Sequence, residues 1–350
     1  MHLARPIGYV LGIFLLSLIL FTQGCKQKTD SIGNLDEIIV FADSVDWLDY
    51  QDALNSIFGK ELITPVIERE FLLHWKPADQ IEKYKKYKNI MFIGNLASKM
   101  PVSKMVTDLL NKEVVAGVKS GDYFYIPQKD VWALRQYVVF LVAPTKNDML
   151  QRIYDLGELV YDDFRKSYYT RLKEHIYAHM ENKDLEEYLA THYPFTLRIP
   201  ADYVLVDEST EDRYVWLRRL HPDRSMFIHW LDYADSIHLD FNWIVKTRNK
   251  ITAKIYEGDI VVEDETHLEK VQFAGHPAYR LEGTWKNPTH IIGGPFRNTT
   301  FVDKKRKMIF MVDFYVQAIG QRKKPFLDQL DVMAHTFKLV EPGKNTRRKE

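Results

Sequence analysis

The sequence predicts a mixed fold of the α+β or α/β class, with two domains that are each a sheet covered by helices and a long helix that joins them. Three patterns indicate this. In residues 36–144, short apolar runs alternate with amphipathic stretches, which is typical of helices that cover a sheet. One apolar stripe with helical spacing runs through residues 145–192. Residues 193–340 hold a series of strand-like segments, which favours a mainly antiparallel sheet.

The first domain, residues 36–144, is expected to open with a buried strand, because residues 37–42 form a short apolar run. An amphipathic helix is predicted at 47–58, where Asp46 can cap the start and Gly59 ends the pattern. The same reasoning predicts the remaining elements, which are strands at 71–75, 89–96, 123–126 and 137–142 and helices at 79–87 and 101–111.

The connector, residues 145–192, is expected to consist mainly of one helix over 147–179, whose apolar stripe comprises Leu150, Ile153, Leu156, Val160, Phe164, Tyr168, Leu172, Ile176 and Met180. We expect a strut between the domains. A coiled-coil seam between two copies is the alternative, although the spacing does not keep strict heptads. His175 and His179 lie four residues apart, a spacing that can bind a metal. Two ligands do not complete a site, so no metal is predicted.

The second domain, residues 193–340, is expected to contain strands at 195–199, 215–220, 226–231, 259–263, 278–285 and 308–316 and helices at 239–256 and 325–337. In the last strand, alternation places Phe310, Val312, Phe314 and Val316 on one side and Ile309, Met311, Asp313 and Tyr315 on the other. These patterns predict an antiparallel sheet with helices packed on one face. Residues 341–350 are a polar tail.

The N-terminus has the layout of an export signal. Arg5 precedes an almost uninterrupted apolar run at residues 7–22, and Gly24 and Cys25, the only cysteine, follow. The run has 16 residues, whereas a membrane-spanning helix needs about 20. We therefore expect a signal peptide at 1–24 and a tether at 25–35 that carries a lipid on Cys25. An uncleaved signal anchor is the alternative.

This segment resembles the lipobox of bacterial lipoproteins, in which Gly24 and Cys25 match the pattern and Thr22 and Gln23 depart from it. The resemblance implies cleavage before Cys25, a thioether-linked diacylglycerol on its sulfur and an acylated amine, which together anchor a protein stably. It also implies a place in the cell envelope, outside the cytoplasm. Lys26 follows the cysteine where some lipoproteins retained at the inner membrane have Asp, which favours the outer membrane.

Two further resemblances concern the folded part. The second domain is similar in outline to the PsbP-like α/β/α sandwich, on its opening strand at 195–200, the strand at 278–285 after Gly275, and the closing strand and helix that end at Phe337. The mature chain resembles a Bacteroidota envelope lipoprotein family catalogued as domain of unknown function 4837. That likeness rests on the Cys25 lipobox, Val131-Trp132-Ala133 and Gly293-Gly294-Pro295-Phe296. The family implies no catalytic chemistry.

Composition excludes several classes of protein. The chain has 48 Lys and Arg against 48 Asp and Glu, which argues against a nucleic-acid partner, since such partners need a basic surface. With Cys25 acylated, no thiol remains for disulfides, redox chemistry or a cysteine-rich zinc site. No cofactor is predicted.

Candidate binding residues are few. If the second domain has a ligand cleft, we expect Arg280, Trp285, Arg297 and Asp313 to line it, from adjacent strand ends and the glycine-rich segment; core packing is the alternative for the tryptophan. Gly293-Gly294 could expose N–H groups to an anion, but a sharp turn into a hairpin is expected. The basic run at 304–307 is expected to be a solvated turn, with contact to anionic headgroups or glycans as the alternative.

The expected function is a lipid-anchored envelope protein that binds an unknown envelope protein or ligand, or assists assembly, without catalysis. An envelope hydrolase acting on glycan, peptide or lipid is one alternative, and it requires a pocket with two titratable groups of perturbed pKa. A structural factor that self-associates through the long helix is the other.

Overall fold

The computed structural model describes residues 28–62, 64–178 and 180–341. The predicted signal peptide, Cys25 and most of the polar tail lie outside these residues. The described chain forms two compact units that interleave along the sequence: the first contains 28–32, Ile39–Asp49 and Trp75–Arg152, and the second contains Gly33–Ile38, Tyr50–His74 and everything from Ile153. The prediction, by contrast, divided the chain at residues 144 and 192.

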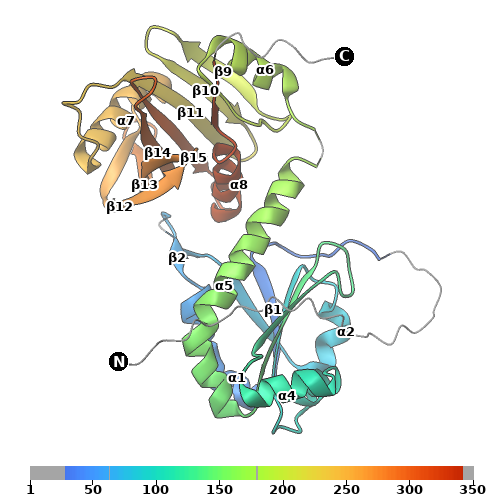
Figure 1. The fold of residues 1–350 in the computed structure, drawn as a ribbon. Helices are drawn as coiled ribbons and strands as arrows, with labels where there is room; N and C mark the ends of the chain where they lie inside the picture. The colour runs from blue at the N-terminus through green and yellow to red at the C-terminus, as the bar shows by residue number, and fades with distance from the viewer. Residues whose placement is uncertain (1–27, 63, 179, 342–350) are drawn as a thin grey trace. The chain divides into compact units, whose positions relative to one another are not determined.

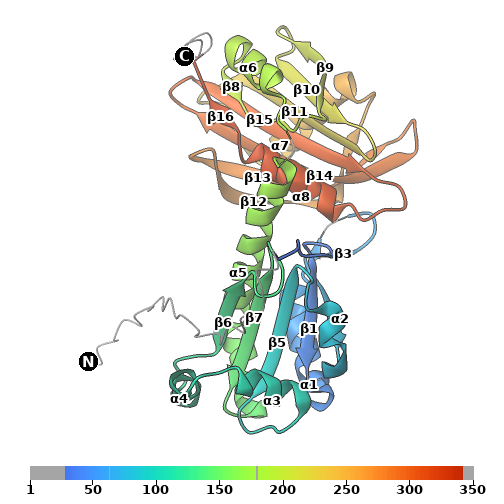
Figure 2. The same ribbon diagram turned by 90° about the vertical axis from the view of Figure 1, so that its right-hand side faces the viewer.

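A five-stranded sheet occupies the N-terminal part of the chain, with strand order β4-β1-β5-β7-β6 (Figure 2). Strands β1 and β5 pair in parallel, as do β5 and β7, whereas β6 is antiparallel to β7. The sheet is therefore mostly parallel, which explains why its central strands read as continuous apolar runs. The strand bounds are β1 Glu37–Ala42, β4 Leu72–Lys76, β5 Asn89–Asn95, β6 Tyr125–Lys129 and β7 Tyr137–Ala143.

Aromatic stacking crosses the centre of this sheet. Phe41, Phe92 and Phe140 lie opposite one another in register on three neighbouring strands. Their rings stack with centroid distances of 5.0 Å and 5.2 Å. The surrounding helices are α1 Ser44–Phe58, α2 Ile81–Tyr84 after a 3-10 turn at Ala78–Gln80, α3 Pro101–Asp108 and α4 Lys112–Ser120. The start of α3 is capped by the Asp43 carboxylate, which accepts hydrogen bonds from the Val102 and Ser103 N–H groups at 2.8 Å and 3.0 Å.

The predicted connector consists of two helices, α5 Lys146–Ile176 and α6 Lys183–His192 (Figure 1). The long helix thus ends three residues earlier than predicted, and Asn182, whose side chain accepts a hydrogen bond from Leu185 N–H at 3.2 Å, caps the next one. Most of the predicted stripe is buried as far as Leu172. Met180, at its predicted end, is 77% exposed. His175 lies on α5, but His179 is outside the described residues.

A seven-stranded antiparallel sheet with order β12-β13-β14-β15-β11-β10-β9 forms most of the C-terminal part. Its strands are β9 Val204–Ser209, β10 Tyr214–Arg219, β11 Asp223–Asp232, β12 Ile260–Phe273, β13 His276–Asn287, β14 Ile292–Asp303 and β15 Met308–Gln317. The predicted opening strand is only the two-residue β8, Phe195–Thr196, paired with β16, Lys338–Leu339. A separate hairpin joins β2, Glu61–Leu62, and β3, Glu68–Arg69. Two helices complete this part, α7 Phe241–Ile255 and α8 Lys324–Ala334.

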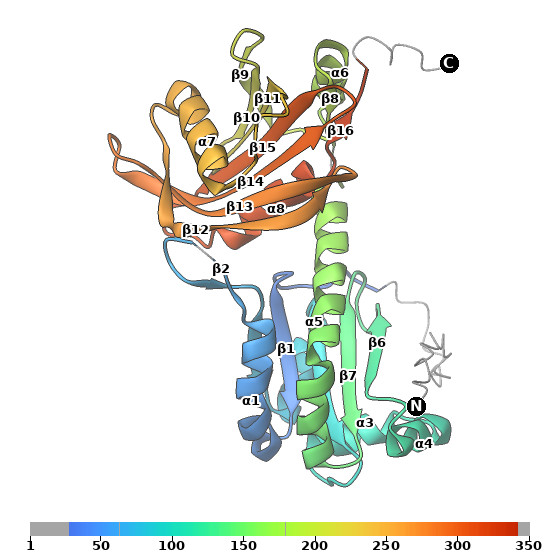
Figure 3. The same cartoon turned by 60° about the vertical axis from the view of Figure 1, so that its left-hand side comes forward.

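The alternation predicted for β15 is confirmed by the two cores of this sheet. Phe310, Val312, Phe314 and Val316 share one core with Leu327 and Leu330 of α8. Met311 and Tyr315 share the other with Ile244 and Val245 of α7. The prediction that helices pack on one face is therefore wrong: α7 and α8 cover opposite faces (Figure 3). The result is the α/β/α outline that the PsbP-like resemblance implied.

Gly293, Gly294, Pro295 and Phe296 do not form the expected turn. They lie within β14, where Gly294 pairs with Trp285. A Cβ atom on Gly294 would overlap the carbonyl oxygen of Val316 on the neighbouring strand. Glycine is therefore required by the close approach of two backbones and not by a bend.

Among the described residues, no helix is both long and apolar enough to cross a membrane.

Replacing Gly294 with alanine is expected to lower the free energy of unfolding by about 2–3 kcal/mol, since the clash is with backbone atoms that cannot rotate away. Chemical denaturation of both proteins measures the loss. Thr289→Ala, an exposed position in the adjacent turn, is the control and should change stability by less than about 0.5 kcal/mol. Equal stability of Gly294→Ala and the original protein would contradict the packing described for β14.

Candidate functional site

The four predicted cleft residues do not line one cleft. Arg280 and Arg297 face α8, where both form ion pairs with Asp331 of that helix. Trp285 lies in the core on the α7 side, against Tyr315 at a centroid distance of 4.6 Å. Asp313 is also on that side. The sheet separates the two pairs because residues an odd number apart on a strand point to opposite faces.

A buried charge network lies on the α8 face of the sheet. It comprises three cations and three carboxylates, namely Arg280, Arg297, Lys324, Glu282, Asp328 and Asp331, and we call it the α8 charge network. The guanidinium of Arg297, from β14, lies 3.0 Å from a carboxylate oxygen of Glu282 on β13. It also lies 3.4 Å from Asp328 and 3.8 Å from Asp331, both on α8. The formal charges within the network cancel.

Asp328 is the centre of this network. Its carboxylate is fully buried and lies 2.6 Å from Nζ of Lys324, one helical turn earlier. It accepts hydrogen bonds from the hydroxyls of Tyr168 and Tyr169 on α5, at 2.7 Å and 3.2 Å. Burial alone would raise the pKa of Asp328, but the nearby charges of Lys324 and Arg297 outweigh it and hold the pKa below its usual range. The carboxylate is therefore kept ionised inside the protein.

Helix α8 takes its N-terminal cap from a distant part of the chain. Lys323, at the N-cap position, makes no side-chain cap. Instead, the Glu68 carboxylate on β3 accepts hydrogen bonds from the N–H groups of Lys323 and Lys324 at 2.7 Å and 2.9 Å. A carboxylate at this end of a helix also interacts favourably with the helix dipole. The β2–β3 hairpin is thereby held against α8.

The α7 face has a buried polar group of its own. Nε of Arg248, on α7, lies 2.8 Å from Asp313, which also accepts a hydrogen bond from the Asn298 side chain at 2.8 Å. The Arg248 guanidinium lies over the Phe296 ring, 4.1 Å from its centroid. Burial raises the pKa of Asp313, and the charge of Arg248 opposes that rise. This pair ties α7 to β15 in the way that Asp328 and Arg297 tie α8 to β14.

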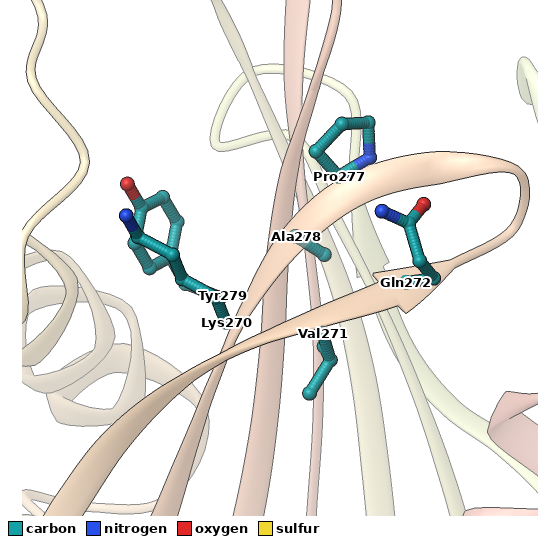
Figure 4. A pocket seen from close by; sticks show the side chains of 6 residues that line it. All are labelled: Lys270, Val271, Gln272, Pro277, Ala278 and Tyr279. Carbon is teal, nitrogen blue, oxygen red and sulfur yellow. The ribbon is translucent and has the colours of Figure 1, made fainter. Parts of the chain in front are cut away.

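An open hollow of 450 Å³ lies where β12 turns into β13 (Figure 4). Its lining is Lys270, Val271, Gln272, Pro277, Ala278 and Tyr279. None of the four predicted cleft residues borders it. The lining offers no carboxylate, histidine or serine, and its ionisable side chains are Lys270 and Tyr279. Within the described part of the chain, no group of three His, Cys, Asp or Glu side chains is placed to hold a metal ion.

The α8 charge network was not foreseen from the sequence. Lys324, Asp328 and Asp331 recur with helical spacing, which is the pattern of a solvated helix face. Leu327 and Leu330 lie between these charged residues in the sequence. Their positions place an apolar stripe beside the charged stripe on one short helix, and this was the feature that could have indicated the network.

The fold and its internal ion pairs define an α/β/α domain whose charged side chains are used for packing. Residues 182–336, which contain it, match the family described as Domain of unknown function (DUF4837), as predicted. Residues 31–177 match a different family, Domain of unknown function (DUF8532). The resemblance that the sequence suggested for the whole mature chain therefore holds for its C-terminal part. Val131-Trp132-Ala133 lies in the region that matches the other family.

Three solved structures with partial similarity each align with less than half of the chain. LpqN, involved in cell envelope biogenesis of Mycobacterium tuberculosis, is 13% identical over 42% of this chain and 83% of its own, with a TM-score of 0.29. The Saccharomyces cerevisiae Ran-binding protein Mog1p is 11% identical over 42% of this chain and 91% of its own, with a TM-score of 0.28. A protein of Bacteroides thetaiotaomicron is 11% identical over 43% of this chain and 47% of its own, with a TM-score of 0.27. No curated protein matches the chain.

Two lysine–aspartate pairs with the same spacing should differ sharply in their contribution to stability. Lys324–Asp328 and Lys104–Asp108 are both four residues apart and 2.6 Å long, but the first is buried and the second is more than 60% exposed. Asp328→Ala should cost about 3–5 kcal/mol, because it removes a fully buried carboxylate that balances the charges of buried Lys324 and Arg297. Asp108→Ala should cost less than about 0.5 kcal/mol. Similar losses in chemical denaturation would refute the structural role of the network.

Asp259 should make stability depend on pH. Burial raises the pKa of Asp259 to about 6, and the charge of Asp313 adds to the rise. A hydrogen bond from Asn287 and the charges of Arg248 and His290 lower the pKa and oppose it. Its protonated form favours the folded state, so this contribution to stability is present below about pH 4 and is lost as the pH rises through about 6. Asp259→Asn should therefore gain stability relative to the original protein over that interval. Denaturation at several pH values measures the gain, with exposed Asp235→Asn as the control; a constant difference would contradict the assignment.

Proposed function

We propose that this chain is a lipid-anchored protein of the cell envelope, outside the cytoplasm, that binds another envelope component or assists assembly and does not catalyse a reaction. The observation that carries the proposal is the use of the deepest charged side chains. Arg297 and Asp328 on one face of the sheet, and Arg248 and Asp313 on the other, are paired with each other. Groups that are committed to internal pairs stabilise packing and are not free to act on a substrate.

The hollow at the β12–β13 turn supports binding over hydrolysis. A hydrolase acting on glycan, peptide or lipid usually combines a carboxylate, histidine or serine with a second catalytic group in a pocket. Lys270 and Tyr279 are the ionisable side chains that line this hollow, and no carboxylate accompanies them. Such a lining suits contact with a partner better than proton transfer.

Self-association through the long helix is less well supported. Val160, Phe164 and Tyr168, which belong to the predicted stripe, are at most 3% exposed within the second unit. Phe164 and Tyr168 pack against Phe71, with ring centroids 6.3 Å and 5.9 Å apart. The stripe is thus occupied by the chain's own side chains, which leaves little of it for a second copy.

The anchor itself rests on the sequence. Cys25 follows an apolar run that is too short to span a membrane comfortably and is preceded by Gly24. Attachment of two or more acyl chains there would hold the folded part at a membrane surface. Lys26 supports the outer membrane as the location. Cross-linking in the native envelope followed by mass spectrometry would identify the partner.

Changing Cys25 to alanine is expected to move the protein from the membrane fraction to the soluble fraction, because the acyl chains lose their attachment point. Lys26→Ala keeps the cysteine and is the matched control, which should stay with membranes. Intact mass of the purified original protein should exceed that of the chain from residue 25 by a diacylglycerol and one acyl group. An unmodified mass, or membrane association of the alanine variant, would remove the anchor.

A further inference from the structure

The hairpin formed by β2 and β3 ends in an exposed apolar tip. It is a two-stranded sheet with no other strand beside it, and it forms a narrow projection (Figure 1). Pro65, Val66 and Ile67 follow one another in its turn, with Val66 64% and Ile67 70% exposed. Turns at protein surfaces are normally polar, and contiguous exposed apolar side chains mark contact with a membrane or another protein.

We propose that this tip, Pro65–Ile67, inserts into the lipid bilayer as a second membrane contact beside the acyl chains of Cys25. The inference rests on the lipid anchor proposed above, since the anchor brings a bilayer within reach. Polar groups that enter a bilayer must be satisfied within the protein, so the backbone of the tip affects the cost of insertion.

Two features of the tip reduce the number of polar groups that insertion would leave without a partner. Pro65 has no N–H. The hydroxyl of Thr64 donates a hydrogen bond to the carbonyl oxygen of Val66, which satisfies both groups. The cost of taking the turn out of water is reduced accordingly, and the gain from burying the apolar side chains remains.

The charges beside the tip in the sequence give no preference for an anionic headgroup. Lys60 and Arg69 are matched by Glu61 and Glu68 in the sequence on either side of the tip, so the formal charges of these four residues cancel. Lys60 also pairs with Glu158 of α5 at 2.6 Å. Insertion should therefore occur into neutral vesicles and depend little on salt.

Covalent reach connects the tip to the anchor. Leu72, five residues after Ile67, donates its N–H to the Asp36 carbonyl at 2.9 Å. Asp36 is eleven residues after Cys25. At about 3.6 Å per extended residue, the tip and the anchored sulfur are at most about 60 Å apart, whatever path the chain takes. A chain held at a membrane by Cys25 can therefore bring this tip to the same bilayer.

The test uses the chain from Lys26 onward, which lacks both the leader and the acylated cysteine and keeps every described residue. That chain contains no cysteine, so Ile67→Cys can carry one environment-sensitive fluorophore. Neutral phosphatidylcholine vesicles should shift its emission to the blue. Val206→Cys, on the edge strand β9 and 42% exposed, is the control and should not respond.

Vesicle flotation of unlabelled variants gives a second readout. Val66→Asp should weaken vesicle association by about tenfold or more, because a buried apolar contact becomes a charge in the interface. Val206→Asp makes the same change elsewhere and should leave association unaltered. Thermal unfolding of both variants verifies that the fold is intact, as expected for exposed positions.

A silent probe at residue 67, or flotation of Val66→Asp equal to that of the original chain, would overturn the inference, and so would a probe that responds to an envelope protein but not to lipid. These outcomes are separate from the anchor. If the tip inserts but the protein carries no acyl group, the inference stands and the proposed anchor is refuted. If the protein is acylated but the tip does not insert, the anchor stands and the inference is refuted.

Discussion

The balance of buried charge at α8 is the constraint on which the second unit depends. Moving a single ion from water to a protein interior costs several kcal/mol, so each member of the α8 charge network is tolerated only while its partners are in place. Asp328 meets Lys324 from its own helix, Arg297 from β14 and two hydroxyls from α5. These contacts come from three different elements, so they constrain both the rotation of α8 and its position along the sheet. The apolar side chains Leu327 and Leu330 supply the favourable burial, while the charged stripe fixes where that burial occurs.

The sheet carries this arrangement on both faces. Alternation along β14 sends Arg297 toward α8 and Asn298 toward α7, where Asn298 binds Asp313. One strand therefore contributes to two separate polar groups, each pairing an arginine with an aspartate. Close backbone approach at Gly294 lets the same strand lie against β15. Because each group is internally matched, the protein places ionised side chains in its core without presenting them to solvent or to a substrate.

Periodicity allowed much of the fold to be predicted. Local spacing of apolar residues can be seen in the sequence itself. It predicted the apolar run at β1, the helical stripe of α5 and the alternation of Phe310 and Met311. The face covered by each helix depends on how the chain crosses over the sheet, and no local pattern records that. The four residues proposed for the cleft do not share a face of the sheet. Arg280 and Trp285 are five residues apart on one strand, and an odd separation places their side chains on opposite faces. Asp328 was missed because a buried carboxylate and a solvated one look alike until their partners are known.

The capping of α8 by Glu68 has a consequence for how the chain reaches this structure. Cap and helix are 255 residues apart, and the tyrosine that binds Asp328 is 160 residues from it. The capping carboxylate and the tyrosine are thus far along the chain from the helix that needs them. Contacts of such high sequence separation are slow to close. Helix α8 can therefore be completed only after segments from distant parts of the chain have met, which makes its docking a late event in folding.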